Sequence, residues 1–460
     1  MLTGGNGKIC FKMLAAALPL AVFGCAGGLV SALQQSGGQV AEAAGVLPAA
    51  RAGTSGSGEE FSFYPRPARH KRPRKDMAAV IMLQGFHWES HQTAPWWNVL
   101  AARAQEIGRA GFDMVWLPPS GQSASDEGYM PVQYYNQNSL YGTEAQLKAA
   151  IAALHSNNVL AIGDMVINHR VGSTNWADFT NPQWGPDAVC SDDEWPGAKG
   201  AKDSGDGFNA ARDIDHSKEY VRKSIVKWML WLRDSIGYDG WRYDYAKGYS
   251  GKYLAYYSDA TSPAFGVGEI WTDLDVNNPD ANRQRICDWM DSAGGRSSAF
   301  DFTTKGLLQY AVTTGEYGRL RDNAGKPAGL LGWWPAKTVT FVDNHDTGSS
   351  PGGGQSHWPF PAQHVMQGYA YILTHPGVPC VYWPHYFDWD MKDEINRLIK
   401  LRRAQAINAV SPVRILKAET NLYAALIGNN TVVKIGPADW LPGPDWKLAV
   451  SGRNYAVWVR

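Results

Sequence analysis

The chain lacks an excess of charge of either sign. Its 460 residues include 43 Lys and Arg and 43 Asp and Glu, so the formal net charge is zero. Proteins that bind nucleic acids or other polyanions concentrate positive charge on one surface. The composition therefore does not favour a polyanionic partner, and no nucleic-acid partner is expected.

Cysteine is scarce, and the few cysteines lie far apart in the sequence. The five are Cys10, Cys25, Cys190, Cys287 and Cys380, and the first two lie in the N-terminal segment 1–58. Three remaining, widely spaced cysteines predict mostly free, buried thiols rather than a disulfide framework. The sequence also has no CxxC pair and no HExxH run, so a zinc site has no support.

The N-terminal segment has the layout of a targeting sequence. Lys8 and Lys12 precede an apolar run at 13–33, and residues 1–58 contain one acid, Glu42. We predict a secretory signal over 1–58 and secretion, followed by a Pro- and Arg-rich linker over 59–76. A membrane anchor, a plastid transit peptide and a lipid anchor are the alternatives, and only this segment, if uncleaved, would contact a membrane.

From Met77 onward, strand-like runs alternate with amphipathic helical stretches. Such alternation predicts an α/β fold, a closed parallel (β/α)8 barrel built from residues 77–169 and 216–403. The irregular stretch 170–215 is too long for an ordinary connection and predicts a small inserted domain. Four short strand-like runs after 404, ALIG, TVVKIG, WKLAVSG and YAVWVR, predict a C-terminal antiparallel β domain over 404–460. The eight strand-like runs are 78–86, 112–117, 159–167, 240–245, 264–270, 298–302, 337–343 and 377–383.

Three carboxylates stand at or just beyond the ends of strand-like runs. Asp244 closes GYDGWRYD, Glu269 lies in AFGVGEIW, and Asp346 closes TVTFVDNHD. Barrel enzymes place their active sites at the carboxyl ends of the strands, and two carboxylates suffice to cleave a glycosidic bond. Each acid alone could be a structural ion pair or a cap, but three at the ends of three strands disfavour that reading.

The neighbours of these acids suggest separate roles. Arg242 and Asp244 share one face of a strand, because side chains alternate with a period of two. A guanidinium beside Asp244 should keep that carboxylate ionised, which suits a nucleophile. Glu269 follows an apolar run, and we expect apolar surroundings to raise its pKa and suit it to general-acid catalysis.

Polar and aromatic side chains accompany the acids. Asn168 and His169 end the third strand-like run, and His345 precedes Asp346. The two histidines lie where donors to sugar hydroxyl groups would be needed. Tyr129, in the loop after the second run, is a candidate stacking platform for a sugar ring.

The ordered segments DMVINH, GWRYDYAKG, GEIW and FVDNHD resemble the conserved regions of α-amylases of glycoside hydrolase family 13. Further segments, among them GFHWES, GYMPVQYY and GWWPAK, are similar to the plant-type, barley-like subfamily. The resemblance covers the chain from about Met77 to its end. It implies retaining, endo-acting hydrolysis of α-1,4-glucosidic bonds in starch-like polysaccharides and oligosaccharides by a monomeric enzyme.

The resemblance also assigns roles to individual residues. It implies that Asp244 is the nucleophile, Glu269 the acid/base and Asp346 the stabiliser of the transition state. The implied sugar-binding residues are Tyr129, His169, Arg242, Lys247, Trp271 and His345, and the adjacent Trp333 and Trp334 match a surface sugar site.

At least one structural calcium ion is implied by the same resemblance. Its ligands would be the side chains of Asn168, Asp203 and Asp213 and the carbonyl groups of Asp206 and Gly248. One ion that gathers hard oxygen ligands would fasten a loose insert to the barrel. The alternative is that these residues cap loops. The insert is short and lacks the acidic stretch of the plant-type enzymes, so we expect fewer calcium ions than those enzymes hold.

Two departures from the family pattern and two other functions remain open. The loop at 349–360 carries a Gly-rich insertion that would reshape the leaving-group side of the cleft, and the tail segment 434–443 offers Trp440 where relatives use a tyrosine. An α-glucan transglycosylase of the same family is the first alternative function. A non-catalytic, transporter-subunit-like protein is the second, and the presence of all three acids disfavours it.

Overall fold

The computed structural model describes residues 75–93, 95–172 and 176–460. The predicted targeting segment and nearly all of the predicted linker lie outside the described residues. In the described part of the chain, no helix combines the length and apolarity that a membrane crossing requires.

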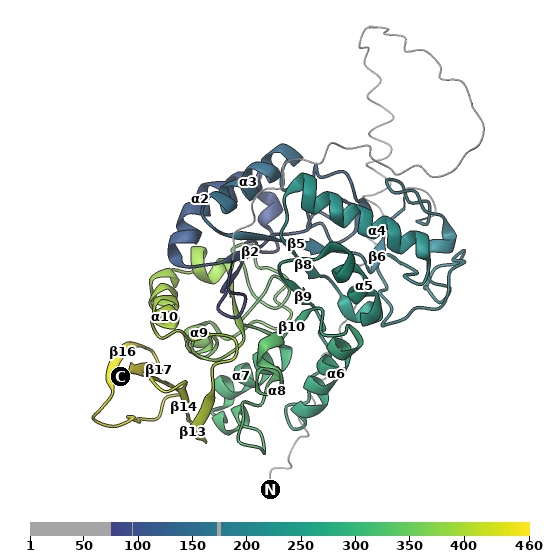
Figure 1. Ribbon diagram of the computed structural model, residues 1–460. Coiled ribbons are helices and arrows are strands. Elements are labelled where there is room, and N and C mark those ends of the chain that lie inside the picture. The colour runs from purple at the N-terminus through teal and green to yellow at the C-terminus, as the bar shows by residue number, and fades with distance from the viewer. Residues whose placement is uncertain (1–74, 94, 173–175) are drawn as a thin grey trace, which may run out of the picture. The chain divides into compact units, whose positions relative to one another are not determined.

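The predicted closed barrel is confirmed. Eight parallel strands pair in the order β1, β12, β11, β10, β9, β8, β5, β2 and back to β1. Helices surround these strands (Figure 1). The strands are β1 Met82–Gln84, β2 Met114–Trp116, β5 Leu160–Met165, β8 Gly240–Tyr243, β9 Gly266–Gly268, β10 Ser298–Phe300, β11 Thr338–Phe341 and β12 Val378–Tyr382.

The outer helices begin and end at residues that favour helix boundaries. Thr143 caps α3 through a reciprocal bond with Gln146, and Gly111 ends α2 with a φ of 98° that glycine adopts without strain. The helices are α2 Trp96–Ala110, α3 Glu144–Ser156, α4 Glu219–Trp231, α5 Gly251–Thr261, α6 Pro279–Ser292, α7 Phe302–Thr314, α8 Leu330–Trp333, α9 Val365–Thr374 and α10 Lys392–Ala404.

Two segments interrupt or extend the barrel. Two short sheets follow β2 and β5, and the second pairs residues near the two ends of the irregular stretch 170–215. Arg170 lies in an aromatic cage, with its guanidinium 4.4 Å from the ring centre of Tyr134 and 4.8 Å from that of Trp184. The short strands are β3 Gln122–Ser123, β4 Pro131–Gln133, β6 His169–Arg170 and β7 Arg212–Asp213.

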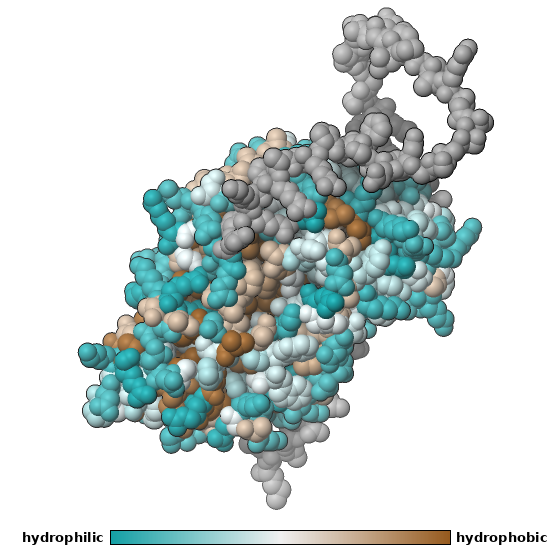
Figure 2. All heavy atoms as spheres, in the orientation of Figure 1, coloured by the Kyte–Doolittle hydropathy of each residue, from teal (hydrophilic) through white to brown (hydrophobic). Residues whose placement is uncertain are grey.

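The chain ends in a five-stranded antiparallel sheet, as predicted, but with one strand more than the sequence indicated. The added strand is β13, where the run VRILKAE is only partly buried, so its apolar pattern is weak. Apolar and hydrophilic residues mix on the surface of this sheet (Figure 2). Its strands are β13 Val413–Glu419, β14 Leu422–Ile427, β15 Thr431–Ile435, β16 Lys447–Gly452 and β17 Tyr455–Val459.

The three cysteines in the described part of the chain are free and buried, as predicted: Cys190, Cys287 and Cys380.

Candidate active site

The three predicted acids lie at one end of the barrel. Asp244 directly follows β8, Glu269 directly follows β9, and Asp346 lies in the loop after β11. The strands themselves are shorter than the runs predicted from sequence. Asp244 and Glu269 are each 7% exposed, and the side chain of Asp346 is 18% exposed.

One buried guanidinium ties these acids together. Arg242 is fully buried in β8, and its Nη1 lies 2.6 Å from Oδ1 of Asp244. Its Nη2 lies 2.9 Å from Oε2 of Glu269. The two carboxylates therefore sit on the two terminal nitrogens of the same side chain, and the shared strand face predicted for Arg242 and Asp244 agrees with this contact.

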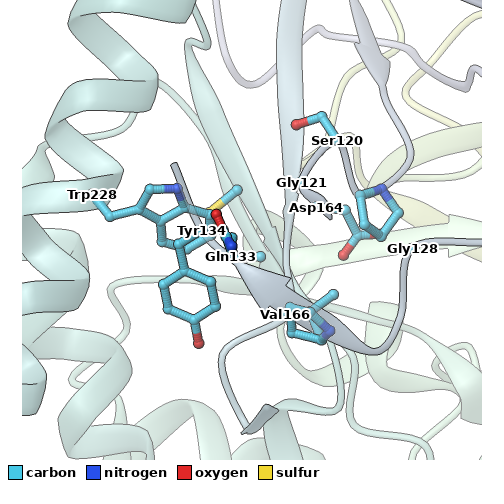
Figure 3. Close-up of a pocket in the computed structure, with 11 residues that line it drawn as sticks. Ser120, Gly121, Gly128, Gln133, Tyr134, Asp164, Val166 and Trp228 are labelled. Atoms are coloured by element: carbon cyan, nitrogen blue, oxygen red, sulfur yellow. The ribbon is translucent and has the colours of Figure 1, made fainter. Parts of the chain in front are cut away.

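A fourth carboxylate belongs to the same group and was missed from the sequence. Asp164, in β5, accepts a bond from Nη1 of Arg242 at 2.8 Å and one from the hydroxyl of Tyr129 at 2.9 Å. Trp116 donates to it as well, at 3.0 Å. A cavity of about 20 Å³ borders Asp164, room for about one water molecule (Figure 3). The rule that found the other three acids did not select Asp164, because this residue stands inside the strand-like run 159–167 rather than at its end.

The carboxylates around Arg242 outnumber its single positive charge, and this overturns the expectation that Asp244 is ionised. Burial raises the pKa of Asp244 to about 8, and the carboxylates of Glu269 and Asp164 act in the same direction, whereas Arg242 opposes them. The sequence predicted an ionised Asp244 because it considered one acid beside one arginine. Several carboxylates share that single guanidinium, so the group retains protons near neutral pH. Burial also raises the pKa of Asp346 well above its usual range.

The surroundings of Glu269 also differ from the apolar setting expected. Besides the ion pair with Arg242, Oε2 of Glu269 accepts a bond from the backbone N–H of Tyr245 at 3.1 Å. The apolar residues before it form β9 and pack into the barrel, while the carboxylate emerges beyond the strand.

Aromatic rings line up beside the acids. The rings of Tyr129 and His345 stack at 5.1 Å with planes 7° apart, and Trp88 lies 6.1 Å from each. The amide of Gln84 donates to Nδ1 of His345 at 3.0 Å, which leaves Nε2–H facing Asp346 at 3.4 Å. Trp88 and Gln84 were not predicted as site residues, although Trp88 lies in the motif GFHWES.

The other predicted sugar-binding residues lie around this group. His169 donates from Nε2 to the carbonyl of Tyr129 at 2.8 Å, and burial lowers its pKa to about 4, so the ring is neutral. Lys247 lies 3.8 Å from Asp206. The indole of Trp271 stacks on Phe302 at 5.3 Å and is half-buried.

The residues predicted to bind calcium converge where the insert meets the barrel. Asn168 donates to Asp213 at 3.0 Å, and the backbone N–H of Asp206 donates to the carbonyl of Lys247 at 3.0 Å. A Cβ at Gly248 would lie 2.1 Å from Oδ1 of Asn168, so only glycine fits there. Oδ2 of Asp203 is buried without a hydrogen-bond partner.

Electrostatics at this point favour a cation. Burial and neighbouring carboxylates raise the pKa of Asp213 to about 8 and that of Asp203 to about 6. Asp193, Glu194 and Asp213 also offer oxygen atoms within 4.8 Å of one another. However, Asp193 already forms an ion pair with Arg212 at 3.1 Å, so this overlapping acidic cluster is partly neutralised.

The adjacent tryptophans predicted as a surface site differ in exposure. Trp333 is 39% exposed at the end of α8, and the guanidinium of Arg283 lies 3.7 Å from its ring centre. Trp334 is half-buried and packs against the core. The exposed aromatic surface of the pair is therefore mainly that of Trp333.

A parallel barrel with a cluster of carboxylates at one end defines a candidate glycoside hydrolase, and comparison with known proteins makes the class specific. The family "Alpha amylase, catalytic domain" matches residues 100–192, and "Alpha-amylase C-terminal beta-sheet domain" matches residues 404–459. The fold also resembles the crystal structure of an α-amylase from Geobacillus thermoleovorans, with a TM-score of 0.61, 16% identity and coverage of 84% of this chain and 99% of that one.

Two curated relatives from Arabidopsis thaliana are similar over most of the chain. "Probable alpha-amylase 2" is 47% identical over 394 residues, which cover 82% of this chain and 93% of the relative. "Alpha-amylase 3, chloroplastic" is 45% identical, and the match spans 44% of its length. The chain belongs to the α-amylase family of glycoside hydrolases, in which it is similar to the plant enzymes, and its activity is glucan hydrolysis.

Proposed function

We propose that the enzyme cleaves internal α-1,4-glucosidic bonds with retention of configuration, with Asp244 as the nucleophile and Glu269 as the acid/base. The observation that carries the proposal is the shared guanidinium, which holds Asp244 and Glu269 on adjacent nitrogens at 2.6 and 2.9 Å. Retaining enzymes need carboxyl groups about 5 Å apart, whereas inverting enzymes need room for a water molecule between them. Such close anchoring favours the retaining arrangement.

The proposed reaction has two steps. Glu269 donates a proton to the leaving glycosidic oxygen while Asp244 attacks the anomeric carbon and forms a glycosyl-enzyme. Glu269 then takes a proton from water, which attacks the same carbon and releases Asp244. Asp346 stabilises the positive charge that develops on the sugar ring. The first step begins with Glu269 protonated and Asp244 ionised. Burial raises the pKa of Asp244 to about 8, and the ion pair with Arg242 at 2.6 Å opposes that rise and holds the attacking carboxylate.

The sugar-binding roles follow from the surroundings. The aligned rings of Trp88, Tyr129 and His345 offer an apolar wall. Burial lowers the pKa of His345, and its Nε2–H is a neutral donor to a sugar hydroxyl. The single N–H of neutral His169 is bound to the carbonyl of Tyr129, so its Nδ1 offers an acceptor instead. We assign Lys247 and Trp271 to neighbouring sugar positions.

Product analysis tests the proposal. Proton NMR during hydrolysis of maltoheptaose should show the α-anomer first, and early β-anomer would exclude retention. Glu269→Gln should lose activity on maltoheptaose. On a maltosyl fluoride, whose leaving group needs no acid, azide should raise the rate of the variant because it attacks the glycosyl-enzyme without a general base. Larger oligosaccharides at early times would instead favour the transglycosylase.

We also propose a structural calcium ion held by Asn168, Asp203, Asp213 and the carbonyl groups of Asp206 and Gly248. The unpartnered oxygen of Asp203 and the raised pKa values of Asp203 and Asp213 support it, because a divalent cation would satisfy hard oxygen ligands in a buried site. The ion would join the insert to the barrel and supply stability rather than chemistry.

Thermal melting tests the calcium proposal. Chelator should lower the Tm of the wild type, and added calcium should restore it. Asp203→Asn should have a lower Tm than the wild type before chelator is added, and chelator should lower that Tm less. Asp187→Asn, an exposed change in the insert, should respond to chelator like the wild type. An equal chelator response in both variants would place the ion elsewhere, for instance at Asp193 and Glu194.

A further inference from the structure

The Gly-rich segment after Asp346, residues 349–357, contacts the active site directly; we call it the strap. Nε2 of Gln355 donates to Oδ1 of Asp346 at 2.7 Å, and the backbone N–H of His357 donates to the carbonyl of Asp346 at 3.0 Å. Nε2 of His357 also donates to Oε1 of Gln355 at 2.7 Å, which orients the amide. The strap therefore holds one oxygen of the Asp346 carboxylate.

A second carboxylate anchors the other part of the strap. Oε1 of Glu89, which follows β1, accepts a bond from the backbone N–H of Gly354 at 2.7 Å. Oε2 of Glu89 accepts a bond from the hydroxyl of Ser350 and lies 3.3 Å from Nδ1 of His87. Glu89 thus binds the strap at Ser350 and at Gly354, and Gly354 directly precedes Gln355.

Glu89 depends on these bonds because it is poorly hydrated. Its side chain is 13% exposed, and its ion-pair partner among the described residues is His87, whose pKa is lowered by burial. Burial raises the pKa of Glu89, but the bonds from Ser350 and Gly354 outweigh it, and the pKa is lowered. Leaving a buried carboxylate without such donors costs free energy, so the bonds between Glu89 and the strap resist breaking.

The tip of the strap is held partly by bonds within the strap, from the backbone N–H of Gly353 to the carbonyl of Ser350 at 2.9 Å and from the hydroxyl of Ser356 to the carbonyl of Gly353 at 2.6 Å. Pro351, Gly352 and Gly353 are exposed, and Pro351 borders a cavity of about 290 Å³ on the side that faces Trp383 and Phe387. Gly353 and Gly354 have φ angles of +112° and +70°, a region that favours glycine. The bonds within the strap do not attach its tip to the barrel, so the position of the tip depends on the bonds that Glu89 accepts.

We infer that Glu89 is a positioning residue for the reaction, which acts through the strap by keeping the amide of Gln355 on the carboxylate of Asp346. The inference rests on the proposed role of Asp346 in the transition state. Glu89 and Gln355 lie at opposite ends of one chain of contacts, so breaking either end should have the same effect on Asp346.

A double-mutant cycle on kcat and KM tests this inference. Gln355→Ala and Glu89→Ala should each lower kcat about tenfold, the effect of losing one charge-assisted hydrogen bond, with KM changed less than about twofold. The double variant should be no slower than the slower single variant, because both changes break the same chain of contacts. Glu89→Gln, which retains an acceptor for Gly354, should recover part of the rate.

The control is Asp259→Asn, an exposed change in α5 that breaks the pair with Arg296 outside the strap and should leave kcat unchanged. Multiplicative losses in the double variant, a raised KM with normal kcat, or an unchanged rate in Gln355→Ala would each overturn the inference. Should Glu89→Ala fail to fold, Glu89→Gln combined with Gln355→Ala provides the same cycle. Asp346→Asn separates the two proposals: full activity there refutes the role of Asp346, whereas loss there beside a normal Gln355→Ala refutes only the strap.

Discussion

Replacing Asp244 by asparagine should abolish turnover and make the enzyme more stable at neutral pH. In the folded chain the pKa of Asp244 is raised from 3.8 to about 8, so the folded state resists ionisation that the unfolded chain accepts freely. For each pH unit between 3.8 and 7, this raised pKa lowers the free energy of unfolding by about 1.4 kcal/mol. The stability lost at pH 7 is therefore at most about 4 kcal/mol. Asparagine also loses the ion pair with Arg242, so we expect a gain of about 1–2 kcal/mol.

The sign of the pH dependence is the sharper test. Stability linked to a raised carboxyl pKa is fully present below 3.8 and is lost as pH rises towards about 8. The difference in Tm between Asp244→Asn and the wild type, measured in constant calcium, should therefore grow from pH 5 to pH 8. Asp259→Asn, an exposed site paired with Arg296, should show no such trend. A variant that is less stable than the wild type at pH 8 would refute the reasoning.

Three further predictions follow from single contacts. Arg242→Lys keeps the charge but cannot bridge Asp164, Asp244 and Glu269. The value of kcat should therefore fall about 100-fold or more, with an unchanged circular dichroism spectrum. Activity near the wild-type value would argue against the role of the shared guanidinium. Gly248→Ala should lower the free energy of unfolding by about 2 kcal/mol in denaturant titration, because its Cβ would collide with Asn168. Trp333→Ala should weaken adsorption to starch granules in a sedimentation assay while turnover of maltoheptaose stays normal, and unchanged adsorption would remove the surface site.

The fold was predictable because the barrel depends on a repeated pattern. Each buried strand reads as a short apolar run, and eight such runs interrupted by amphipathic helices leave few alternatives to a closed barrel. The strand β13 was missed because its side chains are only partly buried, so the apolar signal that marks buried strands is weak there.

The identity of the site was easier to predict than its electrostatics. The acids at the strand ends were found one at a time, and the protonation of Asp244 and Glu269 was predicted from the neighbours of each along its own strand. The structure shows that Asp164, Asp244 and Glu269 all contact Arg242, so the pKa of Asp244 depends on the whole group. Contacts between strands far apart in sequence create that group, and a single strand does not reveal them.

The contact between Glu89 and the strap was also not predictable from the sequence. The sequence showed a Gly-rich insertion beside Asp346, but its partner lies more than 250 residues earlier in the chain, at a separation of 265 for the bond to Gly354. The two residues of such a pair come into contact only in the folded barrel, where the loops after β1 and β11 lie together.

Trapping the glycosyl-enzyme tests the central claim most directly. A fluorinated maltosyl fluoride, which slows hydrolysis of the intermediate, should leave one sugar adduct per chain, and peptide mass spectrometry should locate it on Asp244. An adduct on Asp164, the carboxylate that shares Nη1 of Arg242 with Asp244, or on Glu269 would contradict the account.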